Sequence, residues 1–218
     1  MIRKSLQSGF TLIEMIVSLA VFSVVVTISV GALLVLIATN QQLQNEQSVM
    51  TNLSFALDSM TREIRTGVNY YCDAQNSKNA GPNGRKIFRD GDDLDFAPVQ
   101  DCYDGNAGNR NYQGMSFVEG GQSITRTPDT RVVYFYDSTD GKIYRRVSGQ
   151  DAQSIVSSGL YITDAEFFVS GSEPLEAGGA TSQDQSIVTI YLQARDINDT
   201  AAKSYEIQTT VVQRTLDI

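Results

Sequence analysis

The sequence predicts an α+β protein in which a long N-terminal helix packs on an antiparallel β-sheet head domain. Three observations support this prediction. The first is a run without any charged side chain, from Met15 to Asn45. The second is a stripe of apolar residues at helical spacing after this run, and the third is the alternation of apolar and polar residues in the C-terminal half. The first half of the helix is therefore expected to cross a membrane and the second half to be amphipathic.

The N-terminal apolar segment is long enough to span a bilayer. Its most apolar part, Ile16–Ile37, contains 22 residues, and about 20 helical residues cross the hydrocarbon core. Hydroxyl side chains are tolerated there because they can donate a hydrogen bond to the carbonyl one turn earlier. Arg3 and Lys4 precede the span. These charges predict a cytoplasmic N-terminus, with the chain beyond Ala38 on the outer side.

Three interpretations of this segment compete. A cleaved secretory signal is disfavoured, because the apolar run is too long and no convincing cleavage site with small residues follows it. A plain uncleaved anchor fits the hydropathy but gives Glu14 no role. A carboxylate inside a membrane costs about 2.5–3.5 kcal/mol at the helix centre and less near its edge. The third interpretation is a known processing motif.

The stretch SGFTLIEMIVSLAVF resembles the processing motif of type IV pilins and type II secretion pseudopilins. The resemblance consists of a short basic leader that ends in Gly9, followed by Phe10, Glu14 and a long apolar run. It implies that residues 1–9 are a prepilin leader peptide and that prepilin peptidase cuts between Gly9 and Phe10. The Phe10 amine would then be N-methylated, and Glu14 would pair with the Phe10 amine of a neighbouring subunit during assembly.

The resemblance also implies partners and a location. Residues 10–39 would form the transmembrane helix and later the filament core. They would contact other pilins or pseudopilins and the membrane-embedded assembly platform. The protein would cross the cytoplasmic (inner) membrane once, with a cytoplasmic N-terminus and a periplasmic or extracellular head. Many major pilins have a proline where Gly31 stands here, and because glycine also weakens helices, a local loosening near Gly31 is expected.

Residues 40–66 predict an amphipathic continuation of the same helix. No proline interrupts the chain before Pro82, so one helix from Phe10 to Arg65 that ends at Gly67 is the simplest prediction. Its apolar stripe fits either a coiled-coil seam or a face that packs on a sheet, and the sheet is preferred because the downstream strands need a cover. The stripe consists of Leu43, Met50, Leu53, Leu57, Met60 and Ile64.

Residues 67–218 are expected to form the β-rich head domain outside the membrane. Residues 67–131 are rich in Gly, Asn and Asp, and predict irregular chain with short strands. Cys72 and Cys102 are the two cysteines of the chain. A disulfide between them is favoured over two free or buried thiols if the head lies outside the cytoplasm. The expected short strands are Lys86–Phe88, Leu94–Phe96 and Met115–Val118.

The acidic stretch RDGDDLDF raises the question of calcium. Its four aspartates, Asp90, Asp92, Asp93 and Asp95, could supply oxygen ligands to a hard cation. The spacing lacks the sixth-position glycine and the distant glutamate of an EF-hand loop. A strand with one wet face fits the alternation equally well, so no metal site is predicted.

The C-terminal half predicts regular strands. Val132–Tyr136 and Lys142–Val147 form a hairpin with a turn through Asp140 and Gly141, and a strand containing Ile162 follows. Alternation in the next strand, Ile187–Ala194, favours a core face made by Val188, Ile190 and Leu192. The last strand is Ser204–Gln213, joined to it by Asp196–Thr200. This order is similar to that of the larger minor pseudopilins, especially the J-type subunit.

Several function classes are disfavoured. The chain has no histidine and a formal net charge of −8, which excludes histidine-dependent catalytic triads and disfavours direct nucleic-acid binding. We expect no catalytic residue, no cofactor and no enzymatic activity. Four tyrosines form either an aromatic binding patch or, more often, half-buried parts of a sheet: Tyr70, Tyr71, Tyr134 and Tyr136.

The prediction is therefore a structural subunit, a minor pilin or pseudopilin near the tip of a type IV pilus or type II secretion pseudopilus. The alternative is a pilus-tip binding protein, either an adhesin or a DNA-uptake minor pilin.

Overall fold

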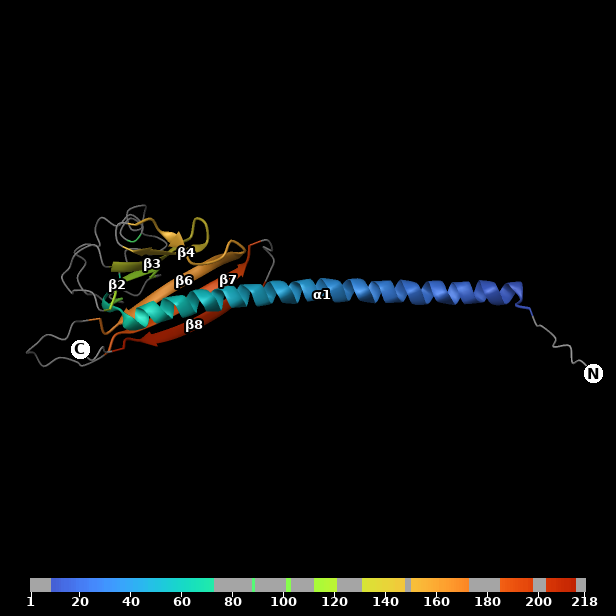
Figure 1. Ribbon diagram of the computed structural model, residues 1–218, viewed down its shortest axis with the longest axis horizontal. Helices are drawn as coiled ribbons and strands as arrows, with labels where there is room; N and C mark the ends of the chain where they lie inside the picture. The colour runs from blue at the N-terminus through green and yellow to red at the C-terminus, as the bar shows by residue number, and fades with distance from the viewer. Residues whose placement is uncertain are drawn as a thin grey trace, which may run out of the picture. The chain divides into compact units, whose positions relative to one another are not determined.

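The computed structural model describes residues 9–72, 88, 101–102, 112–120, 131–147, 150–172, 185–197 and 203–214. Its elements are one long helix and eight strands (Figure 1). They are α1 (Leu12–Thr66), β1 (Val68–Cys72), β2 (Gly114–Val118), β3 (Arg131–Asp137), β4 (Lys142–Val147), β5 (Gln153–Ser154), β6 (Leu160–Ser170), β7 (Ile187–Asp196) and β8 (Tyr205–Val212). The predicted α+β class with a long N-terminal helix and antiparallel sheets is correct.

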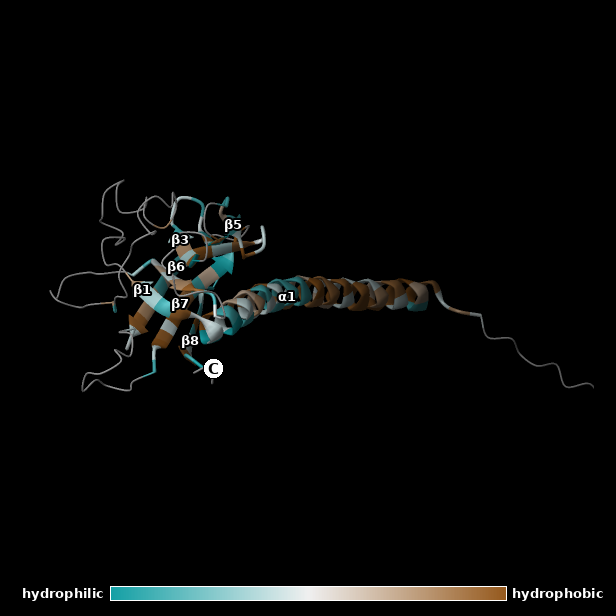
Figure 2. Ribbon diagram, turned by 60° about the vertical axis from the view of Figure 1, so that its left-hand side comes forward, coloured by the Kyte–Doolittle hydropathy of each residue, from teal (hydrophilic) through white to brown (hydrophobic). Residues whose placement is uncertain are grey.

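The chain divides into two units, Met1–Gln47 and Ser48–Ile218, so α1 contributes to both. In the first unit the helix is coloured hydrophobic over most of its length (Figure 2). Hydroxyl groups there donate to the carbonyl four residues earlier, as expected. The helix also continues without a break through Gly31, so the expected loosening is not seen. The hydroxyl bonds join Ser23 to Leu19, Thr27 to Ser23, Ser29 to Val25 and Thr39 to Val35, at 2.8–2.9 Å.

The helix ends at Thr66, immediately before the predicted stop at Gly67. A Cβ at position 67 would collide with the ring of Phe117, so a glycine is needed there. The last carbonyl groups of the helix find partners outside it. The Tyr70 hydroxyl donates to the carbonyl of Ile64, and the Arg214 amide donates to the carbonyl of Arg65 at 2.8 Å. The helix end is therefore held by the strand that follows it and by the chain just after β8.

The part of α1 in the second unit packs its buried face against the strands, so the sheet interpretation of the stripe is right and the coiled-coil seam is wrong. The predicted stripe needs one correction. Met50 is 40% exposed and Leu43 is 50% exposed, whereas Val49 and Ala56 are buried. Both lines fit helical spacing, and packing against the strands selects the one through Val49, Leu53, Ala56 and Met60, at steps of four, three and four. The buried residues are Val49, Leu53, Ala56, Leu57, Met60 and Ile64.

Five strands form one antiparallel sheet in the order β1-β2-β3-β4-β5. Tyr134 and Ile143 belong to the core shared with α1, while Val133 and Phe135 form a second cluster with Phe88. Both faces of β3 are therefore buried. The predicted hairpin is confirmed. Its Gly141 has a φ of 65°, a conformation that glycine adopts without strain.

Strand β1 was not predicted, because residues 67–131 had been expected to be mostly irregular. Asn69 explains why the pattern was missed. Its φ is 53°, and the register with β2 shifts between Val68 and Tyr71. Such a bulge breaks the two-residue alternation on which strand prediction depends. The predicted strand at 115–118 is confirmed by β2. Those at 86–88 and 94–96 lie outside the described residues except for Phe88, which is helical, so the strand prediction is wrong at that residue.

The last three strands form a second antiparallel sheet in the order β6-β7-β8. As predicted, Val188, Ile190 and Leu192 are buried, and they join the same core cluster as the helix. The other edge of β6 receives main-chain bonds from preceding chain. Cys102 N donates to Val169 O at 2.9 Å, and Phe167 N donates to Tyr112 O at 2.7 Å. One apolar core thus connects the C-terminal part of α1 with both sheets.

Candidate processing and assembly site

Gly9 and Phe10 lie in exposed chain directly before the helix. Phe10 is 80% exposed, and a Cβ built on Gly9 would meet no atom within 4 Å. Neither residue belongs to a helix or strand. The peptide bond between them is therefore exposed and lies outside regular secondary structure.

Thr11 and Glu14 cap the start of α1. The Glu14 amide donates to Thr11 Oγ1 at 3.4 Å, and Thr11 Oγ1 lies 3.5 Å from Glu14 Oε2. Thr11 thus supplies the side-chain half of a capping box, while the Glu14 carboxylate accepts from the Thr11 hydroxyl and not from the Thr11 amide. The carboxylate also lies at the positive end of the helix dipole. Sequence reasoning missed this role, although the pattern Thr-Leu-Ile-Glu is its ordinary signature.

The helix beyond the cap presents apolar side chains on every face. None of the residues in its most apolar window is buried by the rest of the chain, and α1 is the helix within the described part that is long and apolar enough to cross a membrane. A helix that is hydrophobic all round must be covered by lipid or by other helices. Examples are Leu12, Ile13, Leu19, Phe22 and Ile28, each at least 65% exposed.

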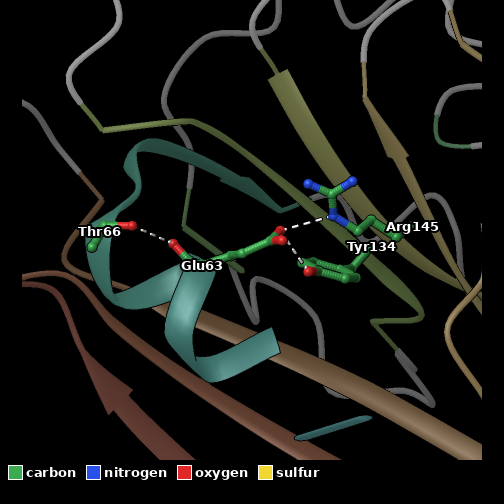
Figure 3. A network of polar contacts seen from close by, with 4 residues as sticks. All are labelled: Glu63, Thr66, Tyr134 and Arg145. Carbon is green, nitrogen blue, oxygen red and sulfur yellow. Dashed lines mark hydrogen bonds and ion pairs between the residues drawn. The ribbon is translucent and has the colours of Figure 1, made fainter. Parts of the chain in front are cut away.

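Glu63 connects the other end of α1 to the five-stranded sheet (Figure 3). Its Oε2 atom accepts a hydrogen bond from the Tyr134 hydroxyl at 2.8 Å and from Arg145 Nε at 2.9 Å. Tyr134 and Arg145 are directly opposite each other on β3 and β4. Burial, followed by the neighbouring Glu63 carboxylate, raises the pKa of Tyr134. The tyrosine therefore stays a neutral donor, and the three side chains form one contact between helix and sheet.

Cys72 and Cys102 form a disulfide, with 5.0 Å between their Cα atoms. Both residues are buried, and the Val169 amide donates to Cys102 Sγ at 3.1 Å. The bond joins the end of β1 to the chain that runs along β6. It therefore ties β1 of the five-stranded sheet to a segment that is hydrogen-bonded to β6 of the three-stranded sheet.

The four tyrosines considered as a binding patch are buried, so that alternative is wrong and the sheet interpretation is right. Tyr70 and Tyr134 are at most 1% exposed, and Tyr71 and Tyr136 at most 8%. The aspartates considered for calcium, Asp90–Asp95, lie outside the described residues. Within the residues that are described, no group of three or more Cys, Asp or Glu side chains is placed to hold a metal ion.

Comparison with known families agrees with the geometry at the N-terminus. Residues 4–30 match the family described as the prokaryotic N-terminal methylation motif. No curated protein and no solved structure matches the chain. The matched segment contains the exposed Gly9–Phe10 bond, the Thr11–Glu14 cap and the first turns of the apolar helix. The motif and the single apolar helix support a type IV pilin-like prepilin, a substrate of prepilin peptidase that is anchored in a membrane by one helix.

Proposed function

We propose that this chain is a minor pilin or pseudopilin, a structural subunit that is cleaved after Gly9 and then assembles into a filament through α1. The observation that supports this function best is the order of features at the N-terminus. An exposed Gly9–Phe10 bond is followed by a capped helix start at Thr11 and by a helix that is apolar on all faces. A cleavable leader in front of such a helix produces a subunit that lipid can hold first and other helices can cover later.

Processing occurs at the cytoplasmic side of the membrane. The leader, residues 1–9, carries Arg3 and Lys4, and positive charges near a span favour the cytoplasmic side. Residues 10–39 cross the membrane, residues 40–66 support the head, and residues 67–218 form the head on the outer side. Prepilin peptidase releases the Phe10 amine, which is then N-methylated and remains cationic.

Glu14 acts in assembly by pairing with the Phe10 amine of the neighbouring subunit. In the single chain, its carboxylate is held by Thr11 and by the helix N-terminus. In an apolar filament core the Thr11 contact and the helix N-terminus do not stabilise the carboxylate sufficiently, because a buried charge is stable only when it is paired. The cation of the next subunit supplies that pair, so the Glu14–Phe10 contact sets the axial register between subunits.

The head suggests a low-abundance subunit near the filament tip. Its β3–β4 hairpin followed by the long β6, β7 and β8 strands has the order that resembles the J-type pseudopilin of type II secretion. A minor type IV pilin would likewise be cleaved after Gly9 and assemble through α1, so it is included in the proposal. Its work is mechanical, and its partners are other pilins or pseudopilins, prepilin peptidase and the assembly platform.

Mass spectrometry of the mature protein tests this function. In cells with an active prepilin peptidase, the chain should begin with N-methylated Phe10, and in cells without the peptidase it should begin with Met1. The variant Ser8→Ala serves as a matched control, since it changes the leader next to the scissile bond but keeps Gly9. A chain that still begins with Met1 in the presence of an active peptidase would refute the proposal.

A further inference from the structure

The three-stranded sheet has an outward face that the core does not use. Alternation directs Phe167 and Ile190 into the core and their neighbours Phe168 and Thr189 outward. Across the strands the outward side chains stand in register, with Glu166 opposite Tyr191 and Tyr191 opposite Gln208. We call the outward side chains of β6, β7 and β8 the outer sheet face.

A shallow hollow of about 370 Å³ lies on the outer sheet face and crosses all three strands. Phe168 is part of the lining of this hollow, and its side chain is 44% exposed. The ring of the buried Tyr112 packs edge-on against Phe168, with 5.0 Å between the ring centroids, so this aromatic surface is held in place. The residues that line the hollow are Glu166, Phe168, Thr189, Tyr191 and Gln208.

The outer sheet face is apolar beyond the end of the hollow that Phe168 and Thr189 line. Ile187 on β7 and Val212 on β8 are directly opposite each other and are 39% and 45% exposed. Phe168 pairs with Thr189 and is a diagonal neighbour of Ile187, so these three apolar side chains form a group at the same end of the outer sheet face. Exposed β-branched and aromatic side chains that cluster in this way are a common feature of protein contact sites.

The other side of the hollow is negatively charged. Glu206 accepts a hydrogen bond from the Gln193 side-chain amide at 2.9 Å. Burial raises the pKa of Tyr191, and the negative charges of Glu206, Asp164 and Glu166 raise it further. Arg195, the cation of this sheet, lies 4.5 Å from the centre of the Tyr161 ring, beyond Gln193 along β7. The hollow therefore lies in a negative field next to this apolar group.

We propose that the outer sheet face docks a partner protein that presents a lysine or arginine side chain next to an apolar side chain. The cation would enter the hollow between the Glu166 carboxylate and the aromatic rings, where ion pairing and cation–π attraction act together. The apolar neighbour would cover Phe168, Ile187 and Val212. The proposal does not rest on processing at Gly9, because every residue in it belongs to the second unit.

The test uses the full chain in its native cells, with a photo-activated cross-linking amino acid at Gln208, an exposed position in the lining of the hollow. A second chain carries the cross-linker at Gln153, which is exposed on β5 of the other sheet. Adducts are identified by mass spectrometry down to the cross-linked peptide. The expected result is an adduct from position 208, absent from position 153, whose peptide contains a lysine or arginine beside an apolar residue.

Charge reversal then decides whether the docking is electrostatic. The double variant Glu166→Lys, Glu206→Lys should reduce the adduct about tenfold or more, since like charges placed in an interface are strongly unfavourable. The neutral pair Glu166→Gln, Glu206→Gln should reduce it less and keeps the test valid if the lysine variant does not fold. Asp151→Lys, which reverses an exposed carboxylate outside the three-stranded sheet, should leave the adduct unchanged.

The final step restores the contact from the other side. Replacing the cross-linked lysine or arginine of the partner with glutamate should recover the adduct with the Glu166→Lys, Glu206→Lys chain. An adduct with a polysaccharide or lipid, an adduct unaffected by charge reversal, or the absence of any adduct at position 208 would each overturn the proposal. Cleavage between Gly9 and Phe10 is measured in the same cells, so failure of docking is distinguished from failure of processing.

Discussion

Glu63 Oε2 lies 2.9 Å from Arg145 Nε and joins the last turns of α1 to the middle of the five-stranded sheet. Glu63→Ala should destabilise the second unit by about 1–3 kcal/mol, because it leaves Tyr134 and Arg145 without their shared acceptor. The loss of the Arg145 contact should contribute at the lower end of this range, since the side chains of Glu63 and Arg145 are both one-third exposed and water weakens their attraction. Denaturant unfolding of the full chain in detergent micelles measures the change. The control is Arg62→Met, which breaks the exposed Asp58–Arg62 pair and should cost less than about 0.5 kcal/mol. Equal effects of both variants would contradict this interpretation.

Leu53 and Phe55 lie on different faces of the same helical turn and should separate stability from assembly. Leu53 is fully buried and Phe55 is 73% exposed. Leu53→Ala should cost about 2–5 kcal/mol of unfolding free energy. Phe55→Ala should change it by less than about 0.5 kcal/mol. If the proposed filament covers this helix face, Phe55→Ala should still lower incorporation, which cross-linking of assembled filaments measures. A large loss of stability in Phe55→Ala would show that the side chain supports the fold instead.

Glu14 and Thr11 should have separable effects. Glu14→Ala should leave membrane insertion and cleavage after Gly9 intact but prevent incorporation, because the cation of the next subunit then has no partner in the apolar core. Thr11→Val removes the cap hydroxyl and keeps the carboxylate, so it should weaken the helix start by about 1 kcal/mol and impair incorporation only mildly. Membrane fractionation and filament yield measure the two steps. Normal incorporation of Glu14→Ala would exclude the pairing.

The disulfide should stabilise the second unit. In the loop-entropy description, a bridge between cysteines 30 residues apart contributes about 3–4 kcal/mol. Replacing both Cys72 and Cys102 with serine should lower the unfolding free energy by about that amount, and the serine hydroxyls add a desolvation cost at these buried positions. Thermal unfolding with and without reductant checks the value. Membrane insertion of the first unit should be unchanged, which provides the internal control.

Stability should fall at high pH because buried tyrosines must stay protonated in the folded chain. Burial is the main cause that raises the pKa of Tyr136 to about 12, and burial also raises that of Tyr70. Such groups contribute stability below their unfolded pKa of about 10 and lose it as pH rises toward the folded value. Each contributes a slope of at most about 1.4 kcal/mol per pH unit. Burial lowers the pKa of Arg131 to about 10 and also lowers that of Lys142, and both shifts act in the opposite direction, against the raised pKa of four tyrosines, Tyr70, Tyr134, Tyr136 and Tyr191.

Urea unfolding between pH 8 and pH 11.5 measures this dependence. Tyr136→Phe removes one titrating group and two hydrogen bonds to carbonyl oxygens on β6. Its unfolding free energy should be lower at pH 8 and fall less steeply above pH 10. An unfolding free energy that stays constant through pH 11 in the original chain would contradict the prediction.

Much of the fold could be predicted because long periodic segments determine it. The uncharged run Met15–Asn45 predicts a long helix, and the alternation around Val188 and Ile190 predicts a strand whose more apolar face lies in the core. Met50 could not be rejected in the same way, since Val49 and Met50 are equally apolar neighbours and only packing against the strands selects one of them. Strand β1 was missed because the left-handed Asn69 breaks its alternation.

In the candidate site, too, local features could be predicted from the sequence and long-range contacts could not. Gly9, Phe10 and Glu14 belong to a local motif, and local motifs are visible in sequence. The contact of Glu63 with Tyr134 and Arg145 was not visible, since its members are 71 and 82 residues apart from the glutamate. Only the hairpin register brings the tyrosine and the arginine to the same point of the helix.

The end of α1 accepts hydrogen bonds from two segments that are far apart in sequence. The Tyr70 hydroxyl on β1 donates to the Ile64 carbonyl, and the Arg214 amide after β8 donates to the Arg65 carbonyl. Helices usually fray at such an end, and their last amides exchange with solvent deuterium within short times. Here fraying would first require release of both β1 and the chain after β8. The last turn of α1 should therefore exchange as slowly as the strands of the core, so that the helix end and the sheets open as one cooperative unit.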